Sequence, residues 1–141
     1  PNPAVAELPR GPAPRPGERA PNAQLTRHRD LFDLLAGYRF HVLAVSRRRL
    51  SAVEAGTLAD ALARLSGDRV ATHLLARMTA GAHGAVERLE RADLFERYGL
   101  ADEHAQALLL VRPDGVLAWR AETLDLPACT TFLRRLGALP R

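Results

Sequence analysis

The chain has 141 residues, of which 47% are hydrophobic. That is enough for one domain with a buried core, but no apolar run approaches the ~20 residues of a membrane span. The single cysteine, Cys129, excludes an internal disulfide, a CxxC redox pair and a cysteine zinc cluster. The formal net charge is +4, and all 20 basic residues are arginines scattered among 16 acids, which disfavours a nucleic-acid-binding surface.

The N-terminal segment is rich in proline, with seven of the ten prolines in the first 21 residues. Proline fixes φ and lacks an N–H donor, so this stretch cannot join a helix or a central strand. We therefore predict an extended linker or arm over residues 1–23 and one domain over residues 24–141. The segment does not resemble a signal peptide, and we expect a cytoplasmic protein.

The first predicted elements are a short helix and a buried strand. Residues 30–37 favour a two-turn helix that Asp30 caps and Gly37 ends in a left-handed conformation. Residues 40–45 are apolar and partly β-branched, which is typical of a central strand buried on both faces.

A second helix and strand follow. Ser51 and Glu54 have the capping-box spacing, and Gly67 stops the helix that they begin. The apolar stripe of this helix is Val53, Leu58, Ala61, Leu62 and Leu65. Residues 69–75 predict a second strand, and a strand–helix–strand unit makes the two strands parallel.

Residues 78–92 contain two glycines, and we predict a loop followed by a helix through Val86 and Leu89. Asp93 can then cap a short helical turn over residues 94–98.

The C-terminal third predicts a hairpin and a helix. Residues 107–111 and 116–120 read as strands, and residues 112–115 join them in a turn of Arg-Pro-Asp-Gly. A last helix spans residues 126–136. The order β-α-β-α-β-β-α, with an extra N-terminal helix, predicts an α/β thioredoxin-like fold of three layers, α/β/α, around a four-stranded mixed sheet.

Three stretches carry a family resemblance: residues 16–25 (PGERAPNAQL), residues 31–35 (LFDLL), and residues 109–120 (LLVRPDGVLAWR). Together they resemble the C-terminal thioredoxin-like domain of FAD-dependent aromatic hydroxylases, the phenol hydroxylase and polyketide hydroxylase group. The signature residues of the hairpin, to which we assign a structural role, are Arg112, Pro113, Asp114, Gly115, Trp119 and Arg120.

The resemblance implies a parent protein that uses FAD and NAD(P)H to hydroxylate an aromatic ring with O₂. It also implies a flavin-binding domain, in the same parent or another subunit, as the partner, and self-association into a homo-oligomer. No GxGxxG motif occurs in the 141 residues, so we assign no catalytic, cofactor-binding or metal-binding residue to this chain. The expected role is structural, with no nucleic-acid or membrane partner.

The position of the thioredoxin redox site offers an alternative function. Residues 46–51 read SRRRLS, without a thiol, and no proline precedes the third strand. Arg47, Arg48 and Arg49 lie close to a predicted helix N-terminus, where an anion can bind. The alternative is therefore a free-standing interaction module that binds an anionic ligand or an acidic partner through these arginines.

The remaining candidates are interpreted as structural. Cys129 could serve a one-cysteine peroxidase, but the threonines follow it, and we expect a small buried hydrophobe. The five histidines lack metal-ligand spacing. Trp119 is expected to lie in the core.

Overall fold

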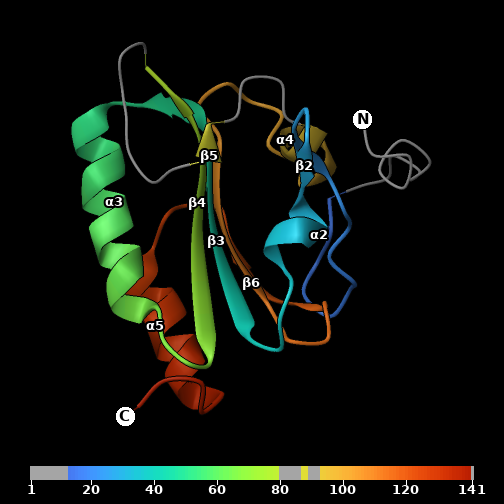
Figure 1. Ribbon diagram of the computed structural model, residues 1–141, viewed down its shortest axis with the longest axis vertical. Coiled ribbons are helices and arrows are strands. Elements are labelled where there is room, and N and C mark those ends of the chain that lie inside the picture. Colours follow the sequence, from blue (N-terminus) through green and yellow to red (C-terminus); the bar gives the residue numbers. More distant parts are fainter. Residues whose placement is uncertain (1–12, 80–86, 89–92, 141) are drawn as a thin grey trace.

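The computed structural model describes residues 13–79, 87–88 and 93–140, and it places a mixed β-sheet between two layers of helices (Figure 1). The sheet order is β5-β4-β3-β6-β7. The strands are β3 (Phe40–Leu50), β4 (Val70–Met78), β5 (Glu87–Arg88), β6 (Gln106–Val111) and β7 (Leu117–Ala121). The helices are α2 (Leu31–Leu34), α3 (Ala52–Leu65), α4 (Asp93–Arg97) and α5 (Leu126–Arg135). A separate pair, β1 (Gln24–Thr26) and β2 (Arg29–Asp30), precedes α2.

The predicted α/β class is confirmed. Strand β3 pairs with β4 in parallel and with β6 in antiparallel fashion, and β6 pairs with β7 as a hairpin. These connections agree with the predicted β-α-β-α-β-β-α order. The four predicted strands are β3, β4, β6 and β7, and the two-residue β5 adds a fifth at the edge beside β4.

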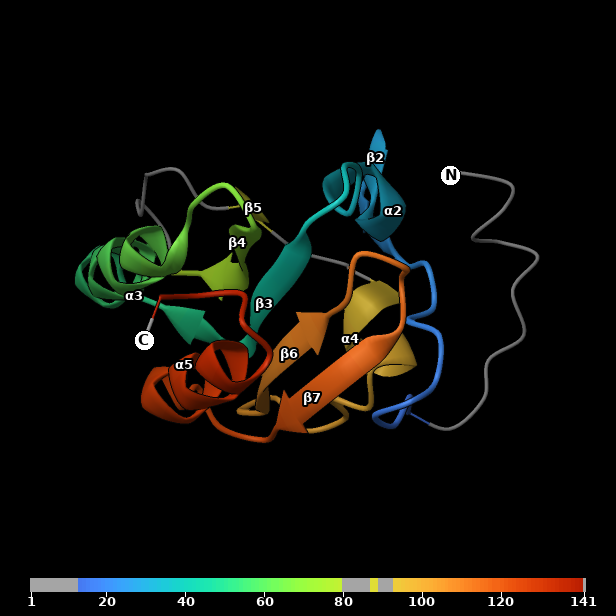
Figure 2. The same ribbon diagram turned by 90° about the horizontal axis from the view of Figure 1, so that it is seen from below.

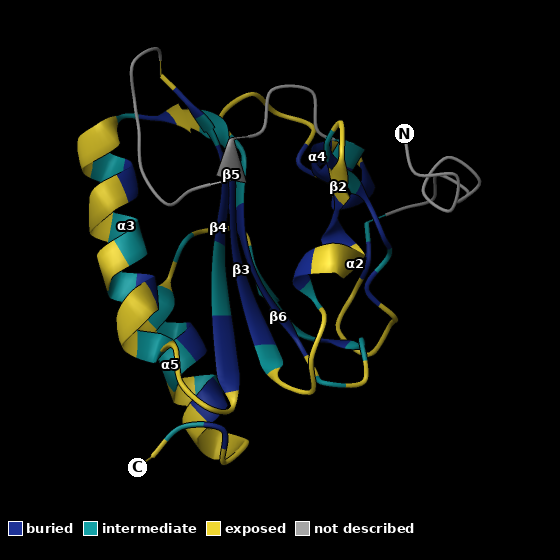
Figure 3. Ribbon diagram, viewed as in Figure 1, coloured by how far each residue is buried: buried dark blue, intermediate teal, exposed yellow. Residues whose placement is uncertain are grey.

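The sheet is buried on both faces because each face has its own hydrophobic core. Helices α3 and α5 cover one face, and α2 and α4 cover the other (Figures 1 and 2). Alternate residues of β3 serve the two cores: Leu43 and Val45 pack with α2 and α4, whereas Val42 and Ala44 pack with α3 and α5. All four are fully buried, and the central strands are dark in Figure 3. The prediction of a strand buried on both faces is confirmed.

Two helices differ from their predictions in detail. Helix α2 spans only Leu31–Leu34, although Asp30 caps it as predicted, in a capping box with Asp33. In α3 the predicted capping box is present, but Val53 is 79% exposed. Leu62 is buried as predicted, and the second buried residue is Ala55, which lies seven residues earlier on the same side of the helix.

Strand β3 is longer than the predicted residues 40–45. It continues through the three arginines to Leu50. Leu50 is fully buried, and its burial stabilises this end of the strand. The pairing of β3 with β4 shifts register between Ser46 and Leu50. The three arginines therefore belong to the irregular end of a strand and not to a loop.

The structure after β4 differs from the predicted helix. Val86 and Leu89, through which a helix was predicted, lie outside the described residues, but Glu87–Arg88 between them form strand β5. The short helix that follows is present as α4, Asp93–Arg97.

The N-terminal segment over residues 13–23 packs against the hairpin. Gly17 N donates to Leu117 O at 2.7 Å, Leu117 N donates to Glu18 O at 2.8 Å, and Ala20 N donates to Gly115 O at 2.9 Å. Ala20 and the later Ala23 are buried in the core. We therefore place residues 13–23 with the domain; residues 1–12 of the predicted arm lie outside the described part.

Candidate functional site

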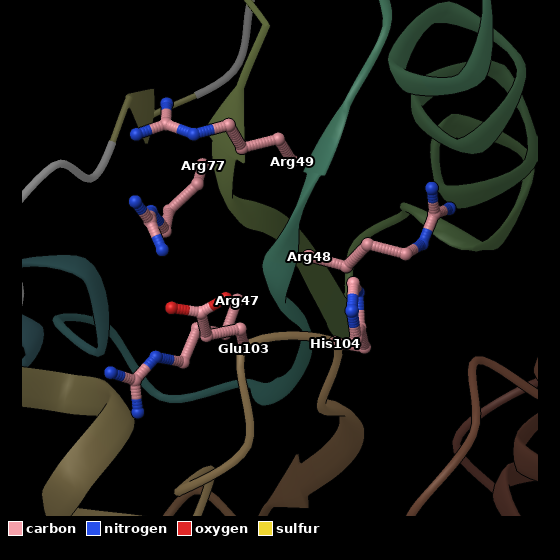
Figure 4. Close-up of a pocket in the computed structure, with 6 residues that line it drawn as sticks. All are labelled: Arg47, Arg48, Arg49, Arg77, Glu103 and His104. Atoms are coloured by element: carbon pink, nitrogen blue, oxygen red, sulfur yellow. The ribbon is translucent and has the colours of Figure 1, made fainter.

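A basic pocket of about 450 Å³ lies where β3 and β4 end (Figure 4). Its lining residues are Arg47, Arg48, Arg49, Arg77, Glu103 and His104, and we call it the arginine pocket. The structure thus brings the three sequence-predicted arginines to one cavity and adds three residues that sequence reasoning missed.

The topology places this pocket at a characteristic point of the sheet. The chain leaves β3 for α3 on one face, and after β4 it reaches α4 on the other face (Figure 2). In open α/β sheets, ligands bind outside the carboxyl ends of neighbouring strands whose connections diverge in this way. The arginine pocket occupies this position between β3 and β4.

Arg48 turns away from the other arginines toward α3 (Figure 4). Its Nη2 lies 2.6 Å from Glu54 Oε2, and Glu54 also accepts from Ser51 N at 3.1 Å. The bond from Arg48 is the largest cause that lowers the pKa of Glu54 to about 2. Arg48 is therefore paired within the chain, and the capping box uses N–H groups that an anion at the start of α3 would need.

Arg47 ties β3 to the segment after α4. Its Nη1 donates to the carbonyl oxygens of Leu100 at 2.8 Å and Ala101 at 3.0 Å, and its guanidinium lies 6.0 Å from the centre of the Phe95 ring. Carbonyl oxygens satisfy donors but do not neutralise the charge. The backbone N–H of Arg47 also donates to Ala105 O at 2.9 Å, which holds the segment containing Glu103 and His104 beside β3.

Arg49 and Arg77 extend to the side of the pocket opposite Arg48 (Figure 4). Arg49 Nη1 donates to Met78 O at 2.9 Å. Arg77 Nε is buried and has no hydrogen-bond partner. The strand pairing Ser46 with Ala76 could have indicated Arg77, but the predicted strand stopped at residue 75.

The described residues that line the arginine pocket suit anion binding, and none of them is a Ser, Thr or Cys. Ser46, in the position where the redox site was sought, is fully buried; its Oγ donates to Arg48 O at 2.7 Å and accepts from Gln106 Nε2 at 3.1 Å. Glu103 and His104 are exposed at the pocket. The pocket can hold an oxyanion by charge and hydrogen bonds.

Cys129 lies on α5 and is fully buried in the core beneath that helix. Burial raises the pKa of its thiol to about 12, so the thiol stays protonated near neutral pH. The expectation of a small buried hydrophobe is consistent with this position, and the peroxidase hypothesis gains no support.

Sequence reasoning missed a histidine pair on the sheet. His41 Nδ1 lies 3.0 Å from His73 Nε2, and the rings stack with centroids 5.3 Å apart. Burial is the first cause that lowers the pKa of both histidines, that of His73 to about 4. In the described part of the chain no third metal-ligating side chain joins them.

The hairpin turn is held by local bonds, as predicted. Gly115 N donates to Arg112 O at 2.9 Å, and Asp114 Oδ1 accepts from Val116 N at 3.2 Å. Gly115 has a φ of +85°, which glycine adopts without strain. Pro113 occupies the first corner of the turn, and the Arg112 guanidinium pairs with the Asp114 carboxylate.

The two remaining signature residues lie on β7. Arg120 pairs with Glu122 at 2.7 Å. Trp119 packs against Phe132 of α5, with ring centroids 6.4 Å apart, and is only partly buried. The prediction of Trp119 as core is therefore corrected to an edge position, because β7 is the outermost strand on its side.

The chain matches the family described as aromatic-ring hydroxylase, C-terminal, over residues 13–138. No curated protein matches it. None of the helices in the described ranges is long and apolar enough to cross a membrane.

Proposed function

Because the chain belongs to the family of aromatic-ring hydroxylase C-terminal domains, we propose that it serves a parent enzyme that uses FAD and NAD(P)H to hydroxylate an aromatic ring with O₂. The family match confirms the resemblance found in the sequence. In the proposed enzyme this thioredoxin-like domain has a structural role and forms contacts with the flavin-binding part or with another subunit. The match over residues 13–138 is the observation that carries the proposal.

The described residues at the junction of β3 and α3 do not fit FAD. Dinucleotides bind where a glycine-rich turn lets a strand and a helix approach the pyrophosphate closely. The corresponding junction between β3 and α3 reads SRRRLS, and the capping box of Ser51 and Glu54 closes the start of the helix. The proposal therefore assigns the flavin to another part of the parent and derives no catalytic step from this chain.

Two exposed aromatic side chains support a contact surface beside α2. Phe32 is 50% exposed and Tyr38 is 87% exposed. A large exposed aromatic side chain loses its contact with water when it is covered by another protein surface. We therefore assign the face around α2 to a contact with the rest of the parent enzyme.

The first test is the intact mass and absorbance of the native protein from its source. We expect a mass several times 15.4 kDa and a flavin absorbance band, while the isolated 141-residue chain shows neither a flavin band nor NAD(P)H oxidation. A native mass near 15.4 kDa, or flavin that co-purifies with the isolated chain, would overturn the proposal.

The contact role is tested in the native protein with Phe32→Ser combined with Tyr38→Ser. We expect a lower thermal midpoint or partial dissociation of subunits by light scattering. Val53→Ser, which removes an exposed apolar side chain on α3, is the control and should change neither. Equal behaviour of both variants would remove the assignment of the α2 face.

A further inference from the structure

We propose that the arginine pocket binds a small anion of the phosphate class, with Arg77 and Arg49 as the groups that hold its oxygens. The inference does not depend on the proposed function, because it uses only the pocket and its lining. It assigns the pocket a ligand class and separates the three adjacent arginines by role.

Positive charge of the arginines is only partly offset within the pocket. Arg48 is paired with Glu54, and Arg47 bonds to carbonyl oxygens that do not cancel its charge. Arg77 Nε is buried and has no partner among the described residues. The guanidinium of Arg77 lines the pocket, and an oxyanion there would accept hydrogen bonds from this group and offset its charge.

The position of the arginine pocket in the sheet also favours a ligand. The pocket lies at the ends of two parallel strands whose connections lead to opposite faces of the sheet (Figures 1 and 2). This is the place where open α/β sheets form a ligand crevice. The bulge between Ser46 and Leu50 widens the strand end and directs consecutive arginines in different directions.

The volume and the lining of the pocket indicate the size and the chemical class of its ligand. The volume of about 450 Å³ falls within the roughly 300–1,000 Å³ typical of small-molecule pockets. Among the described residues that line it there is no Phe, Tyr or Trp, and His104 is the one ring, so the successive bases of a nucleic acid have no row of stacking platforms there. A phosphate presents several oxygens and up to two negative charges to guanidinium groups that come from two strands, whereas one carboxylate presents two oxygens and one charge.

The test is calorimetric titration of the full-length native protein with inorganic phosphate at low, matched ionic strength. We expect Arg77→Gln to bind about tenfold more weakly than the wild type, a change of about 1.4 kcal/mol. Arg64→Gln removes the same charge from an exposed position on α3 outside the pocket. This control should bind within twofold of the wild type. The difference between Arg77→Gln and Arg64→Gln isolates this pocket from any other phosphate site in the protein.

Two further titrations define the ligand. Glycerol 3-phosphate that binds more tightly than inorganic phosphate would support an organic phosphate as the source, and equal affinities would support free phosphate. Succinate that binds as tightly as phosphate would overturn the assignment to phosphate.

Two results of the titrations would overturn the proposal that the pocket binds phosphate. Absence of phosphate binding, or an equal loss in Arg77→Gln and Arg64→Gln, would overturn the proposal, because the attraction would then be absent or spread over the whole surface. Should Arg77→Gln fail to fold, Arg49→Gln gives the same comparison, and a phosphate-dependent rise in thermal midpoint that Arg49→Gln loses supports the site.

Discussion

At the end of the sheet where β6 turns into β7, the polar groups of the turn bond within the chain; at the opposite end, where β3 and β4 finish, four arginines line one pocket. The turn bonds to itself through Asp114 and Gly115 and to the N-terminal segment through Gly17 and Ala20. At the other end Arg77 Nε is buried and unpaired.

The difference separates residues that build the domain from residues that are available to bind. The residues that carry the sequence resemblance include the turn of the hairpin, which bonds to itself and to the N-terminal segment, and we expect this turn to serve the stability of the fold. The arginine pocket is at the far end of the same strands, where charge remains for a ligand. Substitutions at the first end should cost stability, whereas substitutions at the second should cost binding.

The largest expected effect is Asn22→Ala, in the N-terminal segment that packs on the hairpin. Asn22 is 3% exposed, and its Oδ1 accepts from Ala23 N and Phe32 N, both at 3.0 Å. Removal of the acceptor leaves two N–H groups without it, and we expect a loss of about 3 kcal/mol in the free energy of unfolding. Urea denaturation measures it, and Asn22→Asp, which retains an acceptor oxygen, should recover part of the loss. A loss under about 1 kcal/mol for the alanine variant would contradict this account.

Trp119→Ala should have the next largest effect. A fully buried Trp costs ~3–5 kcal/mol on truncation, but Trp119 is partly exposed on the edge strand, so we expect about 2 kcal/mol. Trp119→Phe keeps the packing against Phe132 and should lose less than half as much. Equal losses for both variants, measured by thermal and urea unfolding, would show that the ring contact is not what stabilises β7.

A smaller effect should appear as a dependence of stability on pH. Burial lowers the pKa of His73 to about 4 from an ordinary value of 6.5, with the charges of His41, Arg29 and Arg39 as further causes. Between these values the unfolded chain binds a proton that the folded chain does not. Stability is therefore complete above pH 6.5 and falls as the pH drops toward 4. The difference between these pKa values corresponds to about 3.4 kcal/mol, and because the His73 ring is partly exposed to solvent we expect a loss of about 1.5 kcal/mol.

Urea unfolding at pH 7.5 and pH 4.5 measures this slope. His73→Gln should make it shallower, because one of the two histidines whose pKa is lowered by folding is gone, while His41 remains. His104→Gln, at an exposed position, is the control and should keep the wild-type slope. A slope in His73→Gln equal to that of the wild type would assign the pH dependence to other groups.

Sequence reasoning was most successful where structure depends on neighbours in the chain. Asp30, Ser51 and the turn at residues 112–115 were predicted correctly because caps and turns need only a few consecutive residues. The two-residue β5 was missed because its pairing with β4 leaves no periodic pattern.

The candidate site was predicted only in part, for a related reason. The three arginines of β3 are visible in the sequence, but Arg77 joins them only through the parallel register of β3 and β4. The same register brings His73 to His41, which lie 32 positions apart in the chain. Which of the arginines is paired depends on the side-chain directions at the bulge, which no local pattern specifies.

The smallest expected change in stability is that of Arg77→Gln, and it is the sharpest test of the contrast between the two ends. Arg77 Nε has no partner to lose, and its charge lies in a pocket lined by three other arginines, so its removal relieves repulsion while it shortens a side chain. These effects oppose each other, and we expect a change in the free energy of unfolding within about 0.5 kcal/mol of zero.

Arg47→Gln removes the same charge from the same pocket but breaks two hydrogen bonds to carbonyl oxygens, and should cost about 1 kcal/mol. If Arg77→Gln instead cost as much as Arg47→Gln in urea unfolding, Arg77 would be part of the fold's own bonding. A neutral Arg77→Gln that loses phosphate would mean that the chain keeps this arginine for a ligand, since the fold gains nothing from it.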